Sequence, residues 1–96
     1  MLRHIVMWKL RDENKAANLA EAERLLRSCA ALTPGILQFE VGMAQPGYEA
    51  TYDLILNSSF TDRDALAAYQ NHPDHVAIKP FMKTVVLERQ CMDYGA

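Results

Sequence analysis

Residues 3–10 form an apolar run whose side chains alternate between the two faces of a predicted strand. The run is rich in β-branched and aromatic residues and is too short for a helix. One face carries His4, Val6, Trp8 and Leu10, and the other carries Ile5, Met7 and Lys9. Because both faces are largely apolar, we expect the strand to be covered on both sides, with the Trp8 face turned toward helices.

A helical period follows this strand. Capping residues at Asp12-Glu13-Asn14 precede apolar positions that recur every three or four residues. These positions are Leu19, Ala22, Leu26, Cys29 and Thr33. They predict an amphipathic helix over about residues 14–32, which ends at Pro34-Gly35.

Two strands are expected next. Residues 36–44 alternate between apolar and polar positions, and residues 52–57 resume a strand-like pattern. The loop over residues 45–49 is rich in turn-forming residues. The two strands are therefore predicted to form a hairpin.

The remaining chain predicts two more helices and a final strand. Thr61-Asp62-Arg63-Asp64 is similar to a capping box, and it starts a helix that ends before Pro73. A short helix over about residues 73–81 follows, with Pro80 as its candidate end. The β-branched residues from Val85 onward begin a fourth strand.

This order of elements is typical of an α+β, ferredoxin-like split βαβ fold, with a four-stranded antiparallel sheet and helices on one face. The length fits a single domain over residues 1–96. The second face of the sheet is then uncovered. Its expected residues are Ile5, Met7, Ile55, Val86 and Met92, mixed with Lys9, Glu40, Asp53 and Glu88. The apolar members predict a two-fold homodimer through facing sheets, and the charged members either pair across that interface or remain solvated.

Composition excludes several classes of function. Ten Lys and Arg against twelve Asp and Glu give a formal charge of −2, without the basic cluster of a nucleic-acid-binding protein. Charges interrupt the apolar residues throughout, so neither a membrane span nor an export leader is expected and a cytoplasmic location is predicted. Cys29 and Cys91 lack the spacing of a metal site, and we expect both to be reduced, buried thiols.

The densest candidate chemistry lies at Tyr69-Gln70-Asn71-His72-Pro73-Asp74-His75-Val76. Proline suits the first position of a helix, so His75 falls in the first helical turn. The positive field of a helix N-terminus disfavours a protonated imidazole. We therefore expect the pKa of His75 to be lowered and the ring to be a candidate general base, nearer the pocket than His72. The structural alternative is a helix cap followed by a surface histidine.

Several motifs together resemble the stress-responsive A/B barrel family, also called the Dabb or dimeric α+β barrel family. The resemblance covers nearly the whole chain, and Tyr-x-x-His-Pro-x-His-Val is its most specific part. The motifs are residues 4–10, Pro34-Gly35-Ile36, Phe39-Glu40-Val41-Gly42, residues 52–56, residues 69–76 and Asp93-Tyr94. The resemblance implies two ferredoxin-like subunits whose sheets close into one barrel.

The family includes a polyketide cyclase that performs an aldol condensation without a cofactor. Its base and the tyrosine that acts on the carbonyl correspond to His75 and Tyr69, and a pocket histidine of its first strand corresponds to His4. Some plant members bind a cation through backbone carbonyls, which correspond to Ala30, Thr33 and Ile36. The resemblance thus implies three candidate catalytic residues, no cofactor and no metal site built from side chains.

Departures from the cyclase affect the expected pocket. Leu54 replaces a pocket histidine, and the aromatic residues of the first helix are missing. Trp8 and Phe39 are expected to face the helices and could narrow or fill the cavity. Arg89 stands where the cyclase is apolar, so it could anchor a carboxylate or pair with a buried acid.

Three functions are compatible with these observations. The first is binding of a small apolar or aromatic molecule between sheet and helices, in a pocket with Val6, Trp8, Phe39, Leu54, Leu56, His72, Ile78 and Arg89. The second is a cofactor-independent, polyketide-cyclase-like lyase with His75 as base, Tyr69 at the carbonyl oxygen and His4 orienting the substrate. The third is a cofactor-free monooxygenase, although no residue marks an oxygen-activating site.

Overall fold

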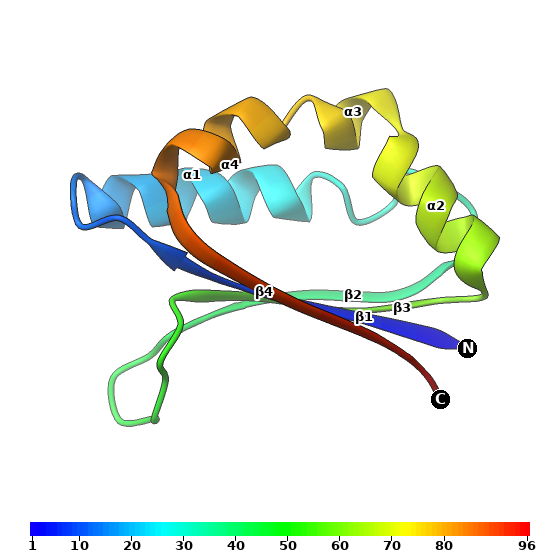
Figure 1. Cartoon of the computed structure of the whole chain (residues 1–96), viewed down its shortest axis with the longest axis horizontal. Coiled ribbons are helices and arrows are strands. Elements are labelled where there is room, and N and C mark those ends of the chain that lie inside the picture. The colour runs from blue at the N-terminus through cyan, green and yellow to red at the C-terminus, as the bar shows by residue number, and fades with distance from the viewer.

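The computed structural model describes all 96 residues as one antiparallel sheet with helices on a single face (Figure 1). The sheet order is β2-β3-β1-β4, which is the ferredoxin-like arrangement. The elements are β1 (Leu2–Leu10), α1 (Lys15–Arg27), β2 (Ile36–Met43), β3 (Leu54–Phe60), α2 (Arg63–Asn71), α3 (Pro73–Val76), α4 (Lys79–Val85) and β4 (Val86–Gly95). None of these helices is long and apolar enough to cross a membrane.

The central strand β1 has the facing predicted from its alternation. His4, Val6, Trp8 and Leu10 are buried on the helix side, whereas the intervening residues are only partly covered. Strand β1 pairs with β3 on one edge and with β4 on the other. The indole of Trp8 is 7% exposed, so the prediction that it lies beneath the helices is confirmed.

The core fills the space between β1, β3 and the helices. Its fully buried members include Leu10 of β1, Phe60 of β3 and Tyr69 of α2. The backbone of Gly35 has a φ of 90°, in the left-handed region that favours glycine. The lack of a side chain also lets α2 approach closely, because a Cβ at this position would lie 2.7 Å from the Cβ of Ala65. The close packing of α2 places Tyr69 directly over the sheet.

Helix α1 is shorter than its apolar period predicts. The expected helix runs to residue 32, but the structure ends it at Arg27 and continues in turns. In these turns Cys29 N–H donates to the carbonyl of Leu26, and Ala30 N–H donates to that of Arg27. Hydrogen bonds from residue i to i−3 tighten the chain beyond α-helical geometry. Apolar spacing alone could not distinguish these turns from helix.

Pro80 begins a helix and does not end one. The expected helix over 73–81 is two elements, α3 and α4, and Pro80 lies in the first turn of α4. A proline in the first turn has no intrahelical hydrogen bond to lose. Val85 correspondingly belongs to α4, and the last strand starts one residue later and continues to Gly95.

A bulge in β4 corrects the expected composition of the open face. Lys9 pairs with Glu88, but Leu10 pairs with Val86, so one residue of β4 is left unpaired. Val86 therefore packs with the core on the helix side, contrary to its predicted place on the open face. Ile5 and Met92 are register partners on the open face, as expected, and Met92 is 65% exposed.

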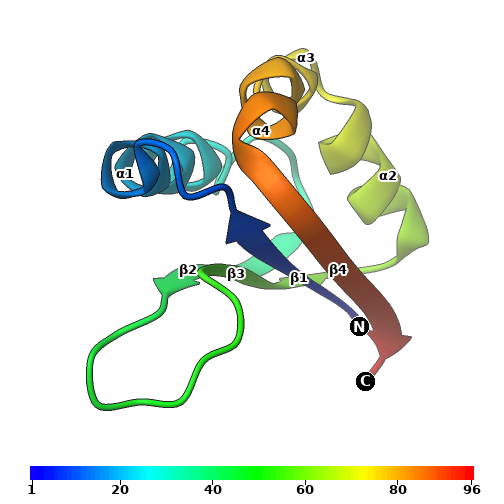
Figure 2. The ribbon, with the colours of Figure 1, turned by 60° about the vertical axis from the view of Figure 1, so that its left-hand side comes forward.

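The loop between β2 and β3 projects away from the helices, below the open face of the sheet (Figure 2). Near its end, the carboxylate of Asp53 accepts from Leu10 N–H at 2.8 Å and lies 3.1 Å from Lys15 Nζ. These contacts fasten the start of β3 to the beginning of α1.

Candidate functional site

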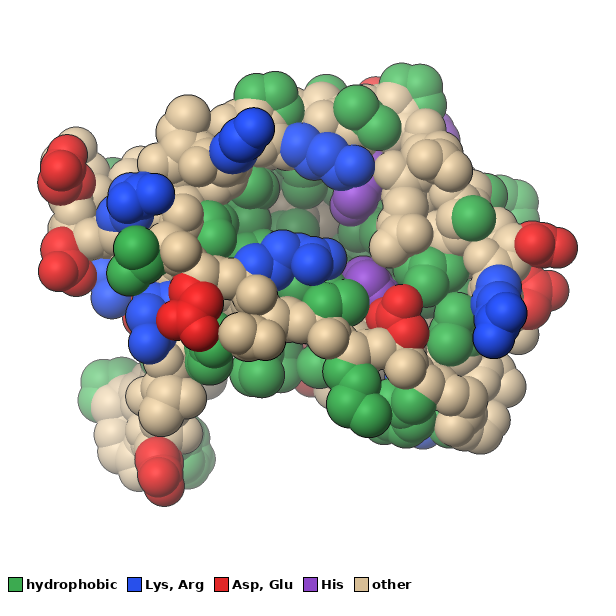
Figure 3. Space-filling view, in the orientation of Figure 1, with side chains coloured by type: hydrophobic (Ala, Val, Ile, Leu, Met, Phe, Trp, Pro, Cys, Tyr) green, Lys and Arg blue, Asp and Glu red, His purple; other side chains and the backbone are tan.

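A cavity of about 330 Å³ lies between the sheet and the helices, on the side of the edge strand β4. Figure 3 shows this hollow, with histidine side chains inside and basic side chains across its mouth. The walls come from β1, β3 and β4 below and from α1, α2, α3 and α4 above. The lining residues are His4, Val6, Trp8, Leu26, Leu56, Tyr69, Gln70, His75, Ile78, Lys79, Met82 and Arg89.

Tyr69 is fully buried at the inner wall of this cavity, and its hydroxyl has no hydrogen-bond partner. Its ring contacts Phe60, with ring centroids 5.2 Å apart, and His75, with centroids 4.6 Å apart. Burial raises the pKa of the phenol far above its ordinary value. Tyr69 therefore remains protonated and can donate a hydrogen bond to a bound molecule.

His75 lies beside Tyr69, and its ring orientation is set by a backbone contact. Its Nδ1 is 3.0 Å from the carbonyl oxygen of Gln70. A carbonyl oxygen only accepts, so Nδ1 carries the proton in the neutral ring and Nε2 keeps a free lone pair. This tautomer gives His75 the acceptor nitrogen that a base requires.

The pKa of His75 is lowered, chiefly because the ring is partly buried, with smaller contributions from the positive charges of Lys79 and Arg89. The direction is the one expected from the sequence, and burial, one of its two expected causes, is the larger. Helix α3 is a single turn of four residues, so His75 does lie in the first helical turn, but so short a helix has only a weak field at its N-terminus. Burial, with the ring packed against Tyr69, is therefore the main reason for a neutral imidazole.

His4 is buried at the opposite wall. Its Nδ1 lies 2.5 Å from Oδ1 of Asp93 on the neighbouring strand, and its backbone carbonyl accepts from the hydroxyl of Ser58 at 2.7 Å. Asp93 pairs with His4 in the register of β1 and β4. Sequence reasoning missed this contact, because the two residues are 89 positions apart and no local motif joins them.

Three residues expected in the pocket do not line this cavity. Phe39 packs edge-on against Tyr69, with ring centroids 5.8 Å apart, and Leu54 is buried in the core. His72 caps α3, because its Nδ1 accepts from the backbone N–H of Asp74. Trp8 forms a wall without filling the space. The other expected residues, Val6, Leu56, Ile78 and Arg89, do line the cavity.

The structure adds four lining residues that the sequence interpretation left out. They are Leu26, Gln70, Lys79 and Met82. Lys79 and Met82 are one turn apart on α4, so correct placement of that helix is the signal that would have found them. Gln70 also holds His75 through its backbone carbonyl, a contact for which no side-chain signal exists.

One group of side chains could approach a metal ion: His4, Cys91 and Asp93 have ligand atoms within 4.8 Å of one another. Cys91 is exposed, contrary to the expectation that both thiols are buried. The separation of 2.5 Å between His4 Nδ1 and Asp93 Oδ1 is that of a hydrogen bond. Two ligands on a tetrahedral ion would be about 3.3 Å apart, given metal–ligand distances of roughly 2.0–2.1 Å. The three groups therefore form a hydrogen-bonded pair beside a thiol.

The carbonyl-ligand candidates Ala30, Thr33 and Ile36 lie between the end of α1 and the start of β2. The hydroxyl of Thr33 is buried without a hydrogen-bond partner. This observation concerns a side chain, whereas the expected ligands are backbone oxygens. The candidate cation site therefore stays a sequence-based prediction.

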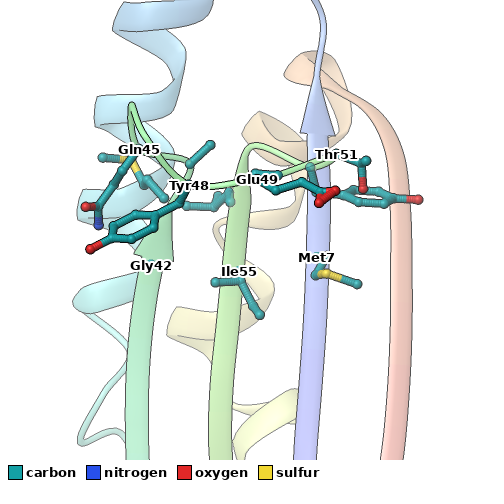
Figure 4. A pocket seen from close by; sticks show the side chains of 12 residues that line it. Met7, Gly42, Gln45, Tyr48, Glu49, Thr51 and Ile55 are labelled. Carbon is teal, nitrogen blue, oxygen red and sulfur yellow. The ribbon is translucent and has the colours of Figure 1, made fainter.

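A second hollow, of about 350 Å³, lies on the open face beneath the β2–β3 loop. Figure 4 shows Met7, Gly42 and Ile55 from the strands, with Tyr48 and Glu49 reaching over from the loop. No histidine and no cation lines it. It lies on the face that is expected to meet a second copy of the chain.

Comparison with known proteins gives a family match over almost the whole chain. The family model described as the Stress Responsive A/B Barrel Domain matches residues 2–96. A dimeric protein of unknown function with a ferredoxin-like fold from Bacteroides fragilis NCTC 9343 is 31% identical, with a TM-score of 0.84 over 99% of this chain and 95% of that one. Comparison with curated proteins gives no match.

Two further structures extend the likeness. A Dabb family protein with a ferredoxin-like fold from Mesorhizobium loti MAFF303099 is 25% identical, with a TM-score of 0.71 over 99% of this chain and 95% of that one. A putative antibiotic biosynthesis monooxygenase from Nitrosomonas europaea is 16% identical, with a TM-score of 0.80 over 100% of this chain and 98% of that one. At the latter identity, the likeness concerns the fold alone.

Proposed function

Because this chain belongs to the stress-responsive A/B barrel family, we propose that it binds a small apolar or aromatic molecule in the cavity between sheet and helices. The observation that carries the proposal is the unpartnered hydroxyl of Tyr69. Leaving a buried polar group unsatisfied costs about 1–3 kcal/mol. A ligand with an acceptor oxygen would remove that cost, because the Tyr69 hydroxyl would then donate a hydrogen bond to it.

The cavity suits such a ligand in size and in surface. Its volume of about 330 Å³ lies at the lower end of the range of small-molecule sites, which is roughly 300–1,000 Å³. Val6, Trp8 and Met82 provide apolar contacts, while Tyr69 and His75 provide polar contacts at one end. The expected ligand is an aromatic or aliphatic body with a carbonyl or similar acceptor.

The proposal is tested by titration with 2-acetylnaphthalene, a neutral aromatic ketone, and the intrinsic fluorescence of Trp8 is the readout. Trp8 is the only tryptophan of the chain and lines the cavity. We expect saturable quenching that Tyr69→Phe weakens about fivefold, because a net hydrogen bond contributes about 1 kcal/mol. The matched control is Tyr52→Phe, which removes a phenol hydroxyl that is bonded to Glu88 outside the cavity. Equal affinity of wild type and Tyr69→Phe would contradict the assigned contact.

A second candidate function is proton abstraction beside a carbonyl, as in a cofactor-independent cyclase or lyase. The neutral tautomer of His75 favours it. Nε2 of His75 would take a proton from the carbon next to the carbonyl, and the C–H electron pair would form the enolate. Tyr69 would donate a hydrogen bond to the enolate oxygen, and His4 would orient the substrate. The enolate carbon would then attack a second carbonyl of the same molecule, and the His75 imidazolium would return the proton to the new alkoxide.

Hydrogen–deuterium exchange at the acetyl methyl group of 2-acetylnaphthalene tests this chemistry without knowledge of the substrate. Proton NMR in D₂O should show exchange that depends on His75 and is slower in Tyr69→Phe. If His75→Asn exchanges the methyl protons as fast as wild type, His75 is not the base. Binding would then remain the proposed function.

A cofactor-free monooxygenase is the third candidate. Its support is the fold likeness to the putative antibiotic biosynthesis monooxygenase, and no residue of the cavity adds to it. We therefore place it below the other two.

We also propose that two copies of the chain pair through their open sheet faces. The dimeric relative from Bacteroides fragilis supports the assembly, and the partly exposed side chains Ile5, Met7 and Ile55 support the face. In this arrangement the second hollow would be covered by the partner, whereas the cavity behind β4 would stay on the outside of the facing sheets.

A further inference from the structure

The mouth of the cavity carries two positive charges that take part in no ion pair. Among the lining residues, Lys79 of α4 and Arg89 of β4 are the cations, and no aspartate or glutamate is present. The remaining walls are apolar apart from Tyr69, Gln70 and the two histidines. Positive charge beside apolar walls attracts an anionic ligand more strongly than it would in open solvent, because such walls weaken dielectric screening.

Neither cation has a carboxylate partner within the chain. The four Lys and Arg ion pairs of the structure involve Lys9, Lys15, Arg24 and Arg27. Glu88 is next to Arg89 in sequence, but alternation along β4 turns it to the open face, where it lies 3.7 Å from Lys9 Nζ. Asp93 shares the face of Arg89 but is hydrogen-bonded to His4. Glu88 is therefore directed away from the cavity, and the Asp93 carboxylate makes its contact with His4 and none with Arg89 or Lys79.

The register of β1 and β4 determines the face of the sheet on which the Arg89 side chain lies. Arg89 is the partner of Trp8 in the β1–β4 ladder, so both side chains rise on the helix side of the sheet. Lys79 approaches from α4, on the helix side of the cavity. Tyr69 is fully buried, whereas Arg89 and Lys79 are exposed. The cavity is thus apolar and hydrogen-bonding inside and cationic at its entrance.

We propose that the ligand of this cavity is an aromatic or aliphatic carboxylic acid whose carboxylate is held by Arg89, with Lys79 adding charge at the mouth. The proposal rests on the proposed binding function. The planar guanidinium offers two parallel N–H donors that match a carboxylate, and charge-assisted hydrogen bonds are stronger than neutral ones. The body of the acid lies against Trp8, and its inner acceptor receives the hydrogen bond of Tyr69.

The test compares 2-naphthoate with 2-naphthamide, which have the same ring system and differ mainly in charge. Affinities are measured by calorimetry and by Trp8 fluorescence at fixed ionic strength. We expect wild type to prefer the naphthoate about tenfold or more, as a charge-assisted bond predicts. Arg89→Met should remove that preference and leave naphthamide affinity within about twofold, because its unbranched side chain keeps the apolar stem without the charge.

Two lysines of α4 provide a matched pair of variants. Lys79→Met should weaken naphthoate affinity about threefold, because the Lys79 ammonium is a single flexible charge at the mouth of the cavity. Lys83→Met removes the same charge from an exposed residue of the same helix that does not line the cavity, and it should change nothing. Thermal melts of all three variants verify that each one folds. We expect stable folds, because Arg89, Lys79 and Lys83 are exposed.

The outcomes separate this inference from the function on which it rests. Saturable but equal binding of naphthoate and naphthamide overturns the carboxylate class and leaves the pocket in place. A loss of naphthoate binding that is as large in Lys83→Met as in Arg89→Met shows general charge attraction and also overturns it. If neither probe nor 2-acetylnaphthalene binds, the proposed binding function fails, and the inference fails with it.

Discussion

The two hollows of this chain are nearly equal in size and differ in chemistry. The cavity behind β4 measures about 330 Å³ and the hollow under the β2–β3 loop about 350 Å³. The first holds an unpartnered buried phenol, a neutral imidazole and two cations without ion pairs, whereas the second is lined by strand residues and by loop residues that include Tyr48 and Glu49. Volume therefore does not distinguish a site from an assembly surface. The distinguishing feature is a buried polar group, the hydroxyl of Tyr69, that lacks a partner within the chain.

The largest expected effect concerns the wall of the first cavity. Trp8→Ala should lower the free energy of unfolding by about 3–5 kcal/mol, because it removes a large buried side chain from the core. Leu87→Ala is the control, since Leu87 is 57% exposed on the bulge of β4 and should change stability by less than about 0.5 kcal/mol. Denaturant melts compare the two. Equal effects would mean that the helix face is not the packed face.

The next prediction concerns the open face and the second hollow. Light scattering should give about twice the chain mass of 10.9 kDa for wild type at micromolar concentration. Ile5→Glu should raise the dimer dissociation constant at least about tenfold, because it buries an unpaired charge opposite Met92. Lys83→Glu, on the helix side, should leave the mass unchanged. A wild-type monomer would contradict the facing-sheet arrangement and leave the second hollow open to solvent.

A smaller effect separates Tyr69 from an ordinary core tyrosine. Removal of a hydrogen-bonded buried hydroxyl usually costs about 1 kcal/mol, but the Tyr69 hydroxyl has no partner to lose. Tyr69→Phe should therefore leave the unfolding free energy of the ligand-free protein unchanged or raise it by up to about 1 kcal/mol, while weakening ligand binding. Chemical denaturation without ligand measures the first part. Clear destabilisation would show that the hydroxyl is structural.

The sequence predicted the parts of the molecule that depend on local pattern. Alternation placed His4 and Trp8 on the helix face, and the proline at position 73 placed the start of α3. The order of elements was sufficient for the ferredoxin-like sheet. These features depend on residues that are close together in the chain, so they can be predicted from one sequence.

The missed features depend on residues that are distant in the chain. The bulge in β4 places Val86 against the core. The expected alternation of side chains along a regular strand does not reveal this extra residue. The contact between His4 and Asp93 depends on the register of the two strands that join the ends of the chain. Lys79 was assigned to one helix over residues 73–81 and not to the pocket, whereas the structure divides that stretch into α3 and α4. Arg89 was expected in the pocket from the sequence, whereas the place of Lys79 at the same mouth could be recognised only from the assembled fold.

The smallest expected effect is the acid dependence of stability that His75 contributes. Burial lowers the pKa of the folded-state ring below the value of about 6.5 that a free histidine has in the unfolded chain. Between the two values the unfolded chain binds more protons than the folded chain. The free energy of unfolding therefore falls as pH decreases from about 6.5 to the folded-state pKa, and this group adds no further loss below that value.

His75→Asn should flatten this dependence, because the Asn amide can donate to the carbonyl of Gln70 in place of Nδ1 but does not titrate. His72→Asn is the matched control: Asn caps a helix as well as His72 does, and His72 does not line the cavity. An NMR titration of the wild-type imidazoles, beside urea melts of all three proteins over the same pH range, measures both quantities. A His75 pKa at or above the free value, with both variants retaining the wild-type slope, would remove the neutral base from the cavity. Tyr69, Arg89 and Lys79 would then remain as the polar contacts of the cavity proposed for a ligand.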